Sequence, residues 1–150
     1  MIALPDLYGF IARFGIGTGM RWGELISAQS KDVQNGALVV DHTKTGKIRR
    51  VQLTPELQSE LRFRLGRIMP LINPWGFAKM VRRYTGISRF HAHQMRHTFA
   101  CRMLEAGVSL AAVQQLLGHS TVVMTQRYAR ISDEMVRREF ERAVASGRLQ

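Results

Sequence analysis

The sequence is poor in cysteine and has no long apolar run. The single thiol of Cys101 cannot form a disulfide within the chain and has no cysteine neighbours with which to bind zinc. It follows Ala100 in an apolar pattern of helical period, so we expect it in the core. No apolar stretch approaches the length of a membrane span, and no basic segment precedes Asp6 as it would in a signal peptide. We therefore expect no signal peptide, no membrane partner and a cytoplasmic, nucleoid-associated location.

Acidic residues are also scarce. The chain has 11 Asp and Glu against 22 Lys and Arg, a net charge of +11, and a pI of about 11.2. Such an excess favours a polyanionic partner, with nucleic acid first and an acidic membrane surface second. Basic ribosomal and chaperone-like proteins share this excess, so charge leaves these classes open. The 45% hydrophobic content and the length of 150 residues suit one globular domain, residues 1–150.

Hydrophobic periodicity and capping residues predict a mainly α-helical domain. The clearest start is Thr54-Pro55-Glu56, with a threonine N-cap, proline at the first helical position and an acid in the first turn. Three glycines, at positions 15, 17 and 19, are expected to loosen the chain around Thr18, and Gly19 to end the first helix. Leu57, Leu61, Leu65 and Ile68 form one apolar stripe. The predicted helices cover residues 5–18, 22–28, 55–68, 75–84, 93–106, 110–117, 121–128 and 132–146.

A change of period after Lys31 predicts a small antiparallel sheet. Residues 37–40 and 50–53 are rich in residues that favour strands, and Asn35-Gly36 is a strong turn signal. We expect two or three strands, with Lys44 near the tip of a hairpin. The fold class is thus mainly α with a small antiparallel β-sheet (α+β).

Two short motifs bring charged groups together. His93 and Arg96 are three residues apart at the start of a helix, so both can face one phosphate. Glu24 follows Arg21 at the same spacing and could fix its guanidinium. Taken singly, these residues have ordinary explanations as surface ion pairs, helix-end histidines and solvated charges.

The motifs are a more specific signal together than singly, because they follow one another in a fixed order. That order is Arg21, Lys44, His93-x-x-Arg96, His119 and Tyr128. In this order, and in the nine-position separation of His119 and Tyr128, the chain resembles the catalytic domain of the tyrosine recombinases, the phage-integrase family. The resemblance extends over roughly residues 14–140. It implies the tyrosine-recombinase catalytic fold, of the DNA breaking-rejoining enzyme type.

The resemblance also assigns the positive groups. Arg21 and Arg96 match the two motif arginines and would clamp the non-bridging oxygens of the scissile phosphate. Lys44 matches the hairpin lysine, a general acid for the leaving 5′ oxygen. Lys47 lies three residues further and could also reach that oxygen; motif position favours Lys44.

The remaining roles follow in the same way. Tyr128 matches the nucleophile, which would leave a 3′-phosphotyrosyl bond and a free 5′ hydroxyl. His93 would act as a base or proton relay, and His119 would donate a hydrogen bond to the phosphate. Glu24 matches an acidic support position and is not expected to react.

The resemblance implies double-stranded DNA as substrate, with no metal and no nucleotide cofactor. It further implies a homotetramer on DNA, accessory DNA-bending proteins, and a prokaryotic or phage-encoded source. The N-terminal core-binding domain of the family is expected to be absent from this chain, as in a fragment or a short protein, and DNA binding to be weak and salt-sensitive. Residues 132–150 form a C-terminal tail that packs either into a neighbouring subunit or back on its own core.

Three other functions stay open from the sequence. Residues 99–119 also fit a helix-turn-helix, which would make the chain a DNA-binding protein without chemistry. A truncated relative could bind DNA without cutting it. A type IB topoisomerase-like activity would use the same chemistry as a recombinase.

Overall fold

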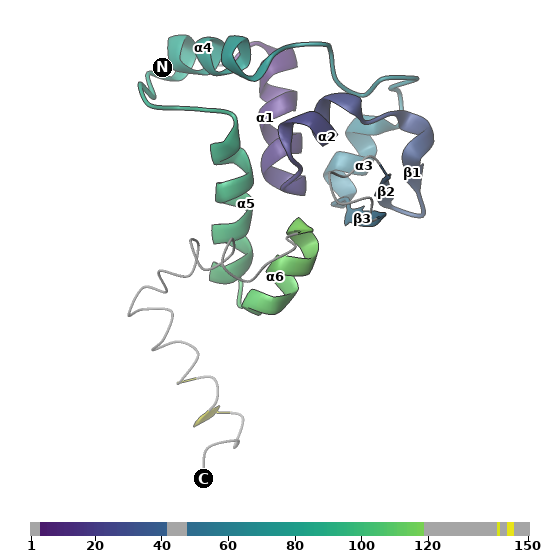
Figure 1. The fold of residues 1–150 in the computed structure, drawn as a ribbon, viewed down its shortest axis with the longest axis vertical. Coiled ribbons are helices and arrows are strands. Elements are labelled where there is room, and N and C mark those ends of the chain that lie inside the picture. The colour runs from purple at the N-terminus through teal and green to yellow at the C-terminus, as the bar shows by residue number, and fades with distance from the viewer. Residues whose placement is uncertain (1–3, 42–47, 119–140, 142–143, 146–150) are drawn as a thin grey trace. The chain divides into compact units, whose positions relative to one another are not determined.

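The structure is a computed structural model that describes residues 4–41, 48–118, 141 and 144–145 (Figure 1). Its contacts divide the chain into two compact units, residues 1–99 and residues 100–150. The described part is mainly helical with one small antiparallel sheet, which confirms the predicted fold class. No described helix is both long enough and apolar enough to cross a membrane.

The first unit begins with two helices joined by a tight turn. Helix α1 spans Asp6–Thr18 and α2 spans Trp22–Ser27. Gly19 ends α1 with φ of 61°, as the sequence predicts, and its N–H donates to the Gly15 carbonyl. The left-handed conformation is accessible to glycine without strain, so the chain can reverse directly into α2.

Gly15 and Gly17 lie inside α1 and do not loosen it, which corrects the prediction. They allow other helices to approach instead. A Cβ on Gly15 would lie 2.8 Å from the Met95 sulfur of α5 (His93–Glu105), and one on Gly17 would lie 2.8 Å from the Leu57 side chain. The missing side chains therefore make room for neighbouring helices.

The sheet has three short strands in the order β1-β2-β3. Strand β1 is Val33–Gln34, β2 is Ala37–Val40 and β3 is Arg49–Gln52. Asn35 and Gly36 both have positive φ, 51° and 74°, so the predicted tight turn connects the first two strands. Pairing of Val40 with Arg49 closes the described part of the β2–β3 hairpin. A 3₁₀ turn, Ser30–Asp32, leads into β1.

Helix α3 is shorter than its apolar stripe predicts. It spans Pro55–Leu61, with the Thr54 hydroxyl accepting from the Leu57 N–H at its start. The chain leaves the helix after Leu61 because its backbone pairs elsewhere: the Ser30 N–H donates to the Gly66 carbonyl, and the Ile68 N–H donates to the Ala28 carbonyl. Ile68 is buried from this loop, whereas Leu65 is 91% exposed.

Helix α4, Pro74–Thr85, completes the core of the first unit. Asn73 caps its start and Gly86, with φ of 74°, caps its end. Phe77 is fully buried and contacts three aromatic rings, those of Tyr8, Trp22 and Phe90. Leucines and valines from the sheet and α3 belong to the same buried cluster, so one apolar core supports both the helices and the hairpin.

Helix α5 runs from the first unit into the second, where Gly107 follows it with φ of 84°. Helix α6 spans Leu110–Leu117, with Ser109 as N-cap and Gly118 as C-cap, as predicted. Cys101 is half-buried, not in the core, and burial raises the pKa of its thiol, with the nearby Glu105 adding to the shift. The helices predicted at 121–128 and 132–146 lie outside the described residues, apart from 141, 144 and 145, which are helical.

Candidate functional site

The candidate site is built on the turn between α1 and α2. Thr18 is buried there, and its hydroxyl donates to the Phe14 carbonyl at 2.6 Å. Gly19 reverses the chain, and Arg21 becomes the N-cap residue of α2. The backbone of Arg21 is therefore fixed by two helix ends at once, which limits where its side chain can reach.

Glu24 fixes Arg21 twice. One carboxylate oxygen, Oε2, accepts the Arg21 backbone N–H at 2.8 Å, and the other, Oε1, accepts its Nη1 at 2.9 Å. The first bond satisfies a backbone donor at the start of α2, as in a capping box. The second is the ion pair that the three-residue spacing predicts. The Arg21 side chain is 31% exposed, whereas that of Glu24 is 5% exposed.

A second guanidinium reaches the same carboxylate. Nη2 of Arg49, the first residue of β3, lies 2.5 Å from Glu24 Oε2, and this side chain is 10% exposed. Arg49 is not among the site residues that the sequence predicts. The two residues are 25 positions apart, and the only available signal was that Arg49 closes the strand beside the hairpin that carries Lys44.

Glu24 is held in its charged form. Burial alone would raise the pKa of its carboxyl group, but the hydrogen bond from the Arg21 backbone and the charge and hydrogen bond of Arg49 outweigh it. The pKa of Glu24 is consequently below its ordinary value. Two arginines around one carboxylate leave this cluster with a net positive charge.

Arg96 is also anchored at this turn. It is 2% exposed, and its Nη1 donates to the Gly19 carbonyl at 2.7 Å. One turn further along α5, Phe99 packs so closely that a Cβ on Gly19 would lie 2.4 Å from its ring. Burial contradicts the ordinary explanation of Arg96 as a solvated charge, because an arginine is rarely buried without fixed partners.

His93 lies one turn before Arg96, and its side chain is exposed. Its pKa is lowered, first by partial desolvation and then by the positive charges of Arg96, His91, His97 and Arg21. The imidazole is thereby kept neutral over more of the physiological pH range, as a proton acceptor must be.

The structure thus brings together Arg21, Glu24, His93 and Arg96 at one turn of the first unit. Lys44, His119 and Tyr128 lie outside the described residues. Among the described residues, no group of three or more His, Cys, Asp or Glu side chains could hold a metal ion.

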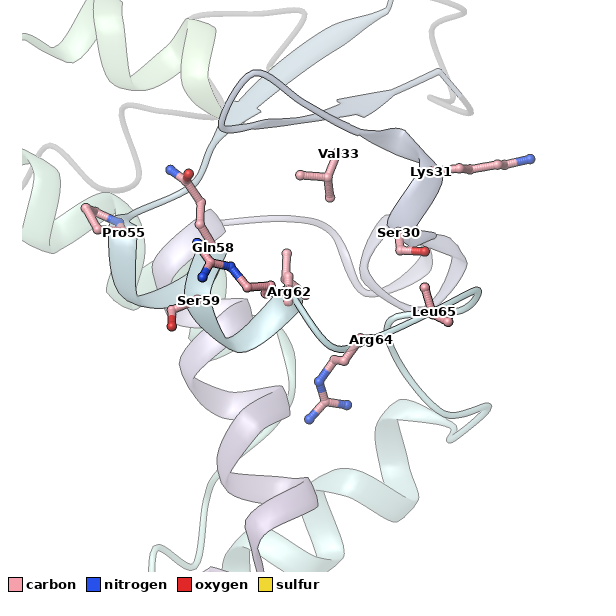
Figure 2. A pocket seen from close by; sticks show the side chains of 10 residues that line it. Ser30, Lys31, Val33, Pro55, Gln58, Ser59, Arg62, Arg64 and Leu65 are labelled. Atoms are coloured by element: carbon pink, nitrogen blue, oxygen red, sulfur yellow. The ribbon is translucent and has the colours of Figure 1, made fainter.

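A groove of about 710 Å³ lies elsewhere in the first unit. Figure 2 shows Gln58 and Arg62 on its α3 side and Val33 on its strand side. None of the predicted site residues that the structure describes, Arg21, Glu24, His93 and Arg96, lines it. Its lining residues are Ser30, Lys31, Val33, Pro55, Gln58, Ser59, Leu61, Arg62, Arg64 and Leu65.

Comparison with known proteins matches this arrangement to one family. The model of the phage integrase family matches residues 72–135, a range that contains the positions of His93, Arg96, His119 and Tyr128. The solved catalytic domain of bacteriophage HP1 integrase is 30% identical, with a TM-score of 0.72, over 91% of this chain and 80% of that domain. This chain belongs to the phage integrase family. The tyrosine-recombinase resemblance seen in the sequence is thereby confirmed.

Longer members of the phage integrase family are similar over most of this chain. Tyrosine recombinase XerA of Pyrococcus furiosus is 31% identical over 147 residues, which cover 85% of this chain and 51% of XerA. The integrase of Haemophilus phage HP1 is 32% identical over 83% of this chain and 37% of its own length. The chain therefore spans about half, or less, of these curated relatives. The Tn1549 transposon integrase, solved with transposon right end DNA, shares the fold with a TM-score of 0.72 at 22% identity.

Proposed function

We propose that this chain is the catalytic domain of a site-specific DNA recombinase that cuts and rejoins strands through Tyr128. The observation that supports it best is the pair of arginines at one turn. Arg21 is held by Glu24 at 2.9 Å, and Arg96 by the Gly19 carbonyl at 2.7 Å. Fixed positive groups of this kind stabilise the charge that develops on a pentacoordinate phosphorus, because they need no reorganisation during the reaction.

In the proposed step the Tyr128 oxygen attacks phosphorus and the bond from phosphorus to the 5′ oxygen breaks. Lys44 donates the proton that the leaving 5′ oxygen needs, and His93 receives the proton of the tyrosine hydroxyl directly or by relay. Arg21, Arg96 and His119 hold the non-bridging oxygens. The lowered pKa of His93 supports its role, since a neutral imidazole can accept a proton.

Rejoining reverses this step. A 5′ hydroxyl attacks the 3′-phosphotyrosyl bond and releases Tyr128, and the bond energy is conserved in the covalent intermediate. The cycle as proposed needs neither a nucleotide nor a metal, because arginine, lysine and histidine supply all the positive charge. The partner is double-stranded DNA, on which four copies of the chain would act with DNA-bending proteins in the cytoplasm. Residues 132–150 would pack either between those copies or back on their own core.

Covalent trapping tests the proposal. The protein is incubated in EDTA with supercoiled plasmid and with nicked duplexes labelled at the 5′ end of the cut strand, and is quenched in SDS. We expect a labelled protein–DNA adduct from the wild type, because the 3′ phosphate stays on the tyrosine. Tyr128→Phe should give none, whereas the matched control Tyr84→Phe should give the wild-type amount.

The outcomes separate the functions left open by the sequence. DNA binding without an adduct would favour a helix-turn-helix-type or truncated DNA-binding protein. An adduct accompanied by plasmid relaxation, with no strand exchange between two DNA molecules, would favour a type IB topoisomerase-like activity. An adduct and strand exchange together are the result expected for a recombinase.

A further inference from the structure

Arg49 has no assigned role in the proposed reaction, yet it holds one of the most constrained contacts of the site. Its Nη2 lies 2.5 Å from Glu24 Oε2, and both side chains are at most 10% exposed. The same oxygen also accepts the Arg21 backbone N–H at 2.8 Å. Arg49 therefore shares its acceptor with the residue that is proposed to bind the phosphate.

The shared carboxylate of Glu24 affects the net charge around Arg21. Arg21 and Glu24 alone form a neutral pair, in which a buried carboxylate cancels the positive charge that a phosphate would meet. Arg49 supplies a second positive charge to that carboxylate, and the three groups together carry a net charge of about +1. Because the cluster is largely buried, solvent screens these charges less than it would at the surface.

Arg49 also connects two parts of the fold. It is the first residue of β3 and pairs with Val40 of β2, while Glu24 belongs to the first turn of α2. The covalent chain between Val40 and Arg49 carries Lys44. The ion pair thus ties both ends of the segment that contains the proposed general acid to the helix that positions Arg21.

We propose that Arg49 is a positioning residue of this site, which holds Glu24 beneath Arg21 and restores the positive charge that Glu24 removes. The expected effect of Arg49 on the cleavage rate rests on the proposed function. Its expected effect on the position and pKa of Glu24 depends only on the folded chain. The lowered pKa of Glu24, to which the charge of Arg49 contributes, is consistent with it.

The first measurement follows Glu24 directly, by ¹³C NMR titration of side-chain carboxyl groups in the full 150-residue chain. Glu24→Gln identifies the resonance by its loss. We expect Arg49→Met to raise the pKa of Glu24, and Arg49→Lys to restore much of the wild-type value. Arg50→Met is the matched control: Arg50 is the next residue of the same strand, and its side chain is exposed. It should leave the titration of Glu24 unchanged.

The second measurement is single-turnover cleavage of a nicked duplex at saturating protein. We expect Arg49→Met to slow adduct formation on the order of 10²-fold, because a displaced phosphate clamp costs about that much. Arg50→Met should stay within about 2-fold of the wild type, and Arg49→Lys should recover most of the rate. In the Arg49→Met background, Glu24→Gln should increase the rate, because it removes the carboxylate that cancels the positive charge of Arg21. A purely structural role of Arg49 predicts a further loss instead.

These outcomes decide the inference in either case. Equal effects of Arg49→Met and Arg50→Met, or an unchanged Glu24 titration, would overturn it. If wild type forms no adduct, the proposed function fails, and the Glu24 titration still decides whether Arg49 holds the carboxylate. Arg49→Gln keeps a donor without the charge, and it replaces Arg49→Met in both measurements if that variant does not fold.

Discussion

Two glutamates in the first unit, Glu24 and Glu60, bind arginine in different surroundings. Arg13 binds Glu60 through two parallel hydrogen bonds, of 3.1 and 2.7 Å, with side chains 58% and 31% exposed. Glu24 is 5% exposed and accepts from two arginines. By bond geometry the Arg13–Glu60 pair is at least as good. Burial and a surplus of positive charge, not bond length, distinguish the cluster that could act on a phosphate.

The largest expected effect comes from removing each carboxylate. Glu24→Ala should lower the free energy of unfolding by about 3 kcal/mol or more, because it removes a largely buried carboxylate that binds two guanidinium groups. Glu60→Ala should cost less than about 1 kcal/mol, as surface pairs do. Urea unfolding of the two variants measures this difference. Equal losses would mean that burial does not separate the two contacts.

Comparing Gly19 with Gly86 measures how tightly Phe99 packs against the turn that binds Arg96. Gly19 and Gly86 both have positive φ, 61° and 74°, but only at Gly19 would a Cβ meet a neighbour, the Phe99 ring at 2.4 Å. Gly86→Ala should cost about 1 kcal/mol for the backbone conformation alone. Gly19→Ala should cost roughly 2–3 kcal/mol, because the ring must also move. Thermal unfolding of both variants gives the difference, and a matching loss at the two positions would rule out tight packing at Gly19.

Acid titration should separate the two carboxylates by their response to salt. Both have a lowered pKa: Glu24 despite its burial, through Arg21 and Arg49, and Glu60 chiefly through its hydrogen bond to Arg13. A lowered pKa stabilises the fold above the unfolded value near 4.5, and this stability is lost as the pH falls through the folded pKa.

In about 1 M salt the screening length falls to roughly 3 Å, so the contribution of the exposed Glu60 should shrink most. Glu24→Gln should therefore reduce the loss of unfolding free energy on acidification at both low and high salt. Glu60→Gln should reduce this loss only at low salt. Unfolding free energies measured between pH 6 and pH 3 provide the test, and a Glu24 contribution that disappears in high salt would mean that this carboxylate behaves like a surface pair.

The smallest effect concerns His93. Desolvation lowers its pKa first, and the charges of Arg96, His91, His97 and Arg21 lower it further. Added salt screens the charges but not the desolvation, so the pKa should rise toward its ordinary value without reaching it. Imidazole proton resonances followed across pH at low and high salt show this shift. No response to salt would mean that the positive groups are not close to His93.

Local signals in the sequence account for most of the described fold. Thr54-Pro55 marks a helix start and Asn35-Gly36 a turn through contacts within a few residues, and each is found where predicted. The apolar stripe that ends at Ile68 predicts too long a helix, because the backbone beyond Leu61 pairs with a distant segment of the chain. The backbone of Ile68 bonds Ala28, forty residues earlier in the chain, and no local pattern encodes such a partner.

In the candidate site, too, contacts between near neighbours in the sequence were predicted and long-range contacts were not. The spacing of Arg21 and Glu24 predicted their contact, because residues three apart on a helix are neighbours. Arg49 was missed, and so was the Gly19 carbonyl that binds Arg96, since both contacts depend on the tertiary fold. The roles of Lys44, His119 and Tyr128 remain predictions from the family resemblance.

The contacts of the arginine cluster also imply an order of assembly. Arg21 and Glu24 are three positions apart and can pair as soon as α2 forms, whereas Arg49 joins Glu24 across 25 positions and Arg96 reaches Gly19 across 77. Closing longer loops is slower, so the cluster should form in that sequence during folding. On a ribosome, Arg96 would reach the Gly19 carbonyl only after the chain through α5 has emerged. An incompletely synthesised chain would thus hold one arm of the phosphate clamp and not the other.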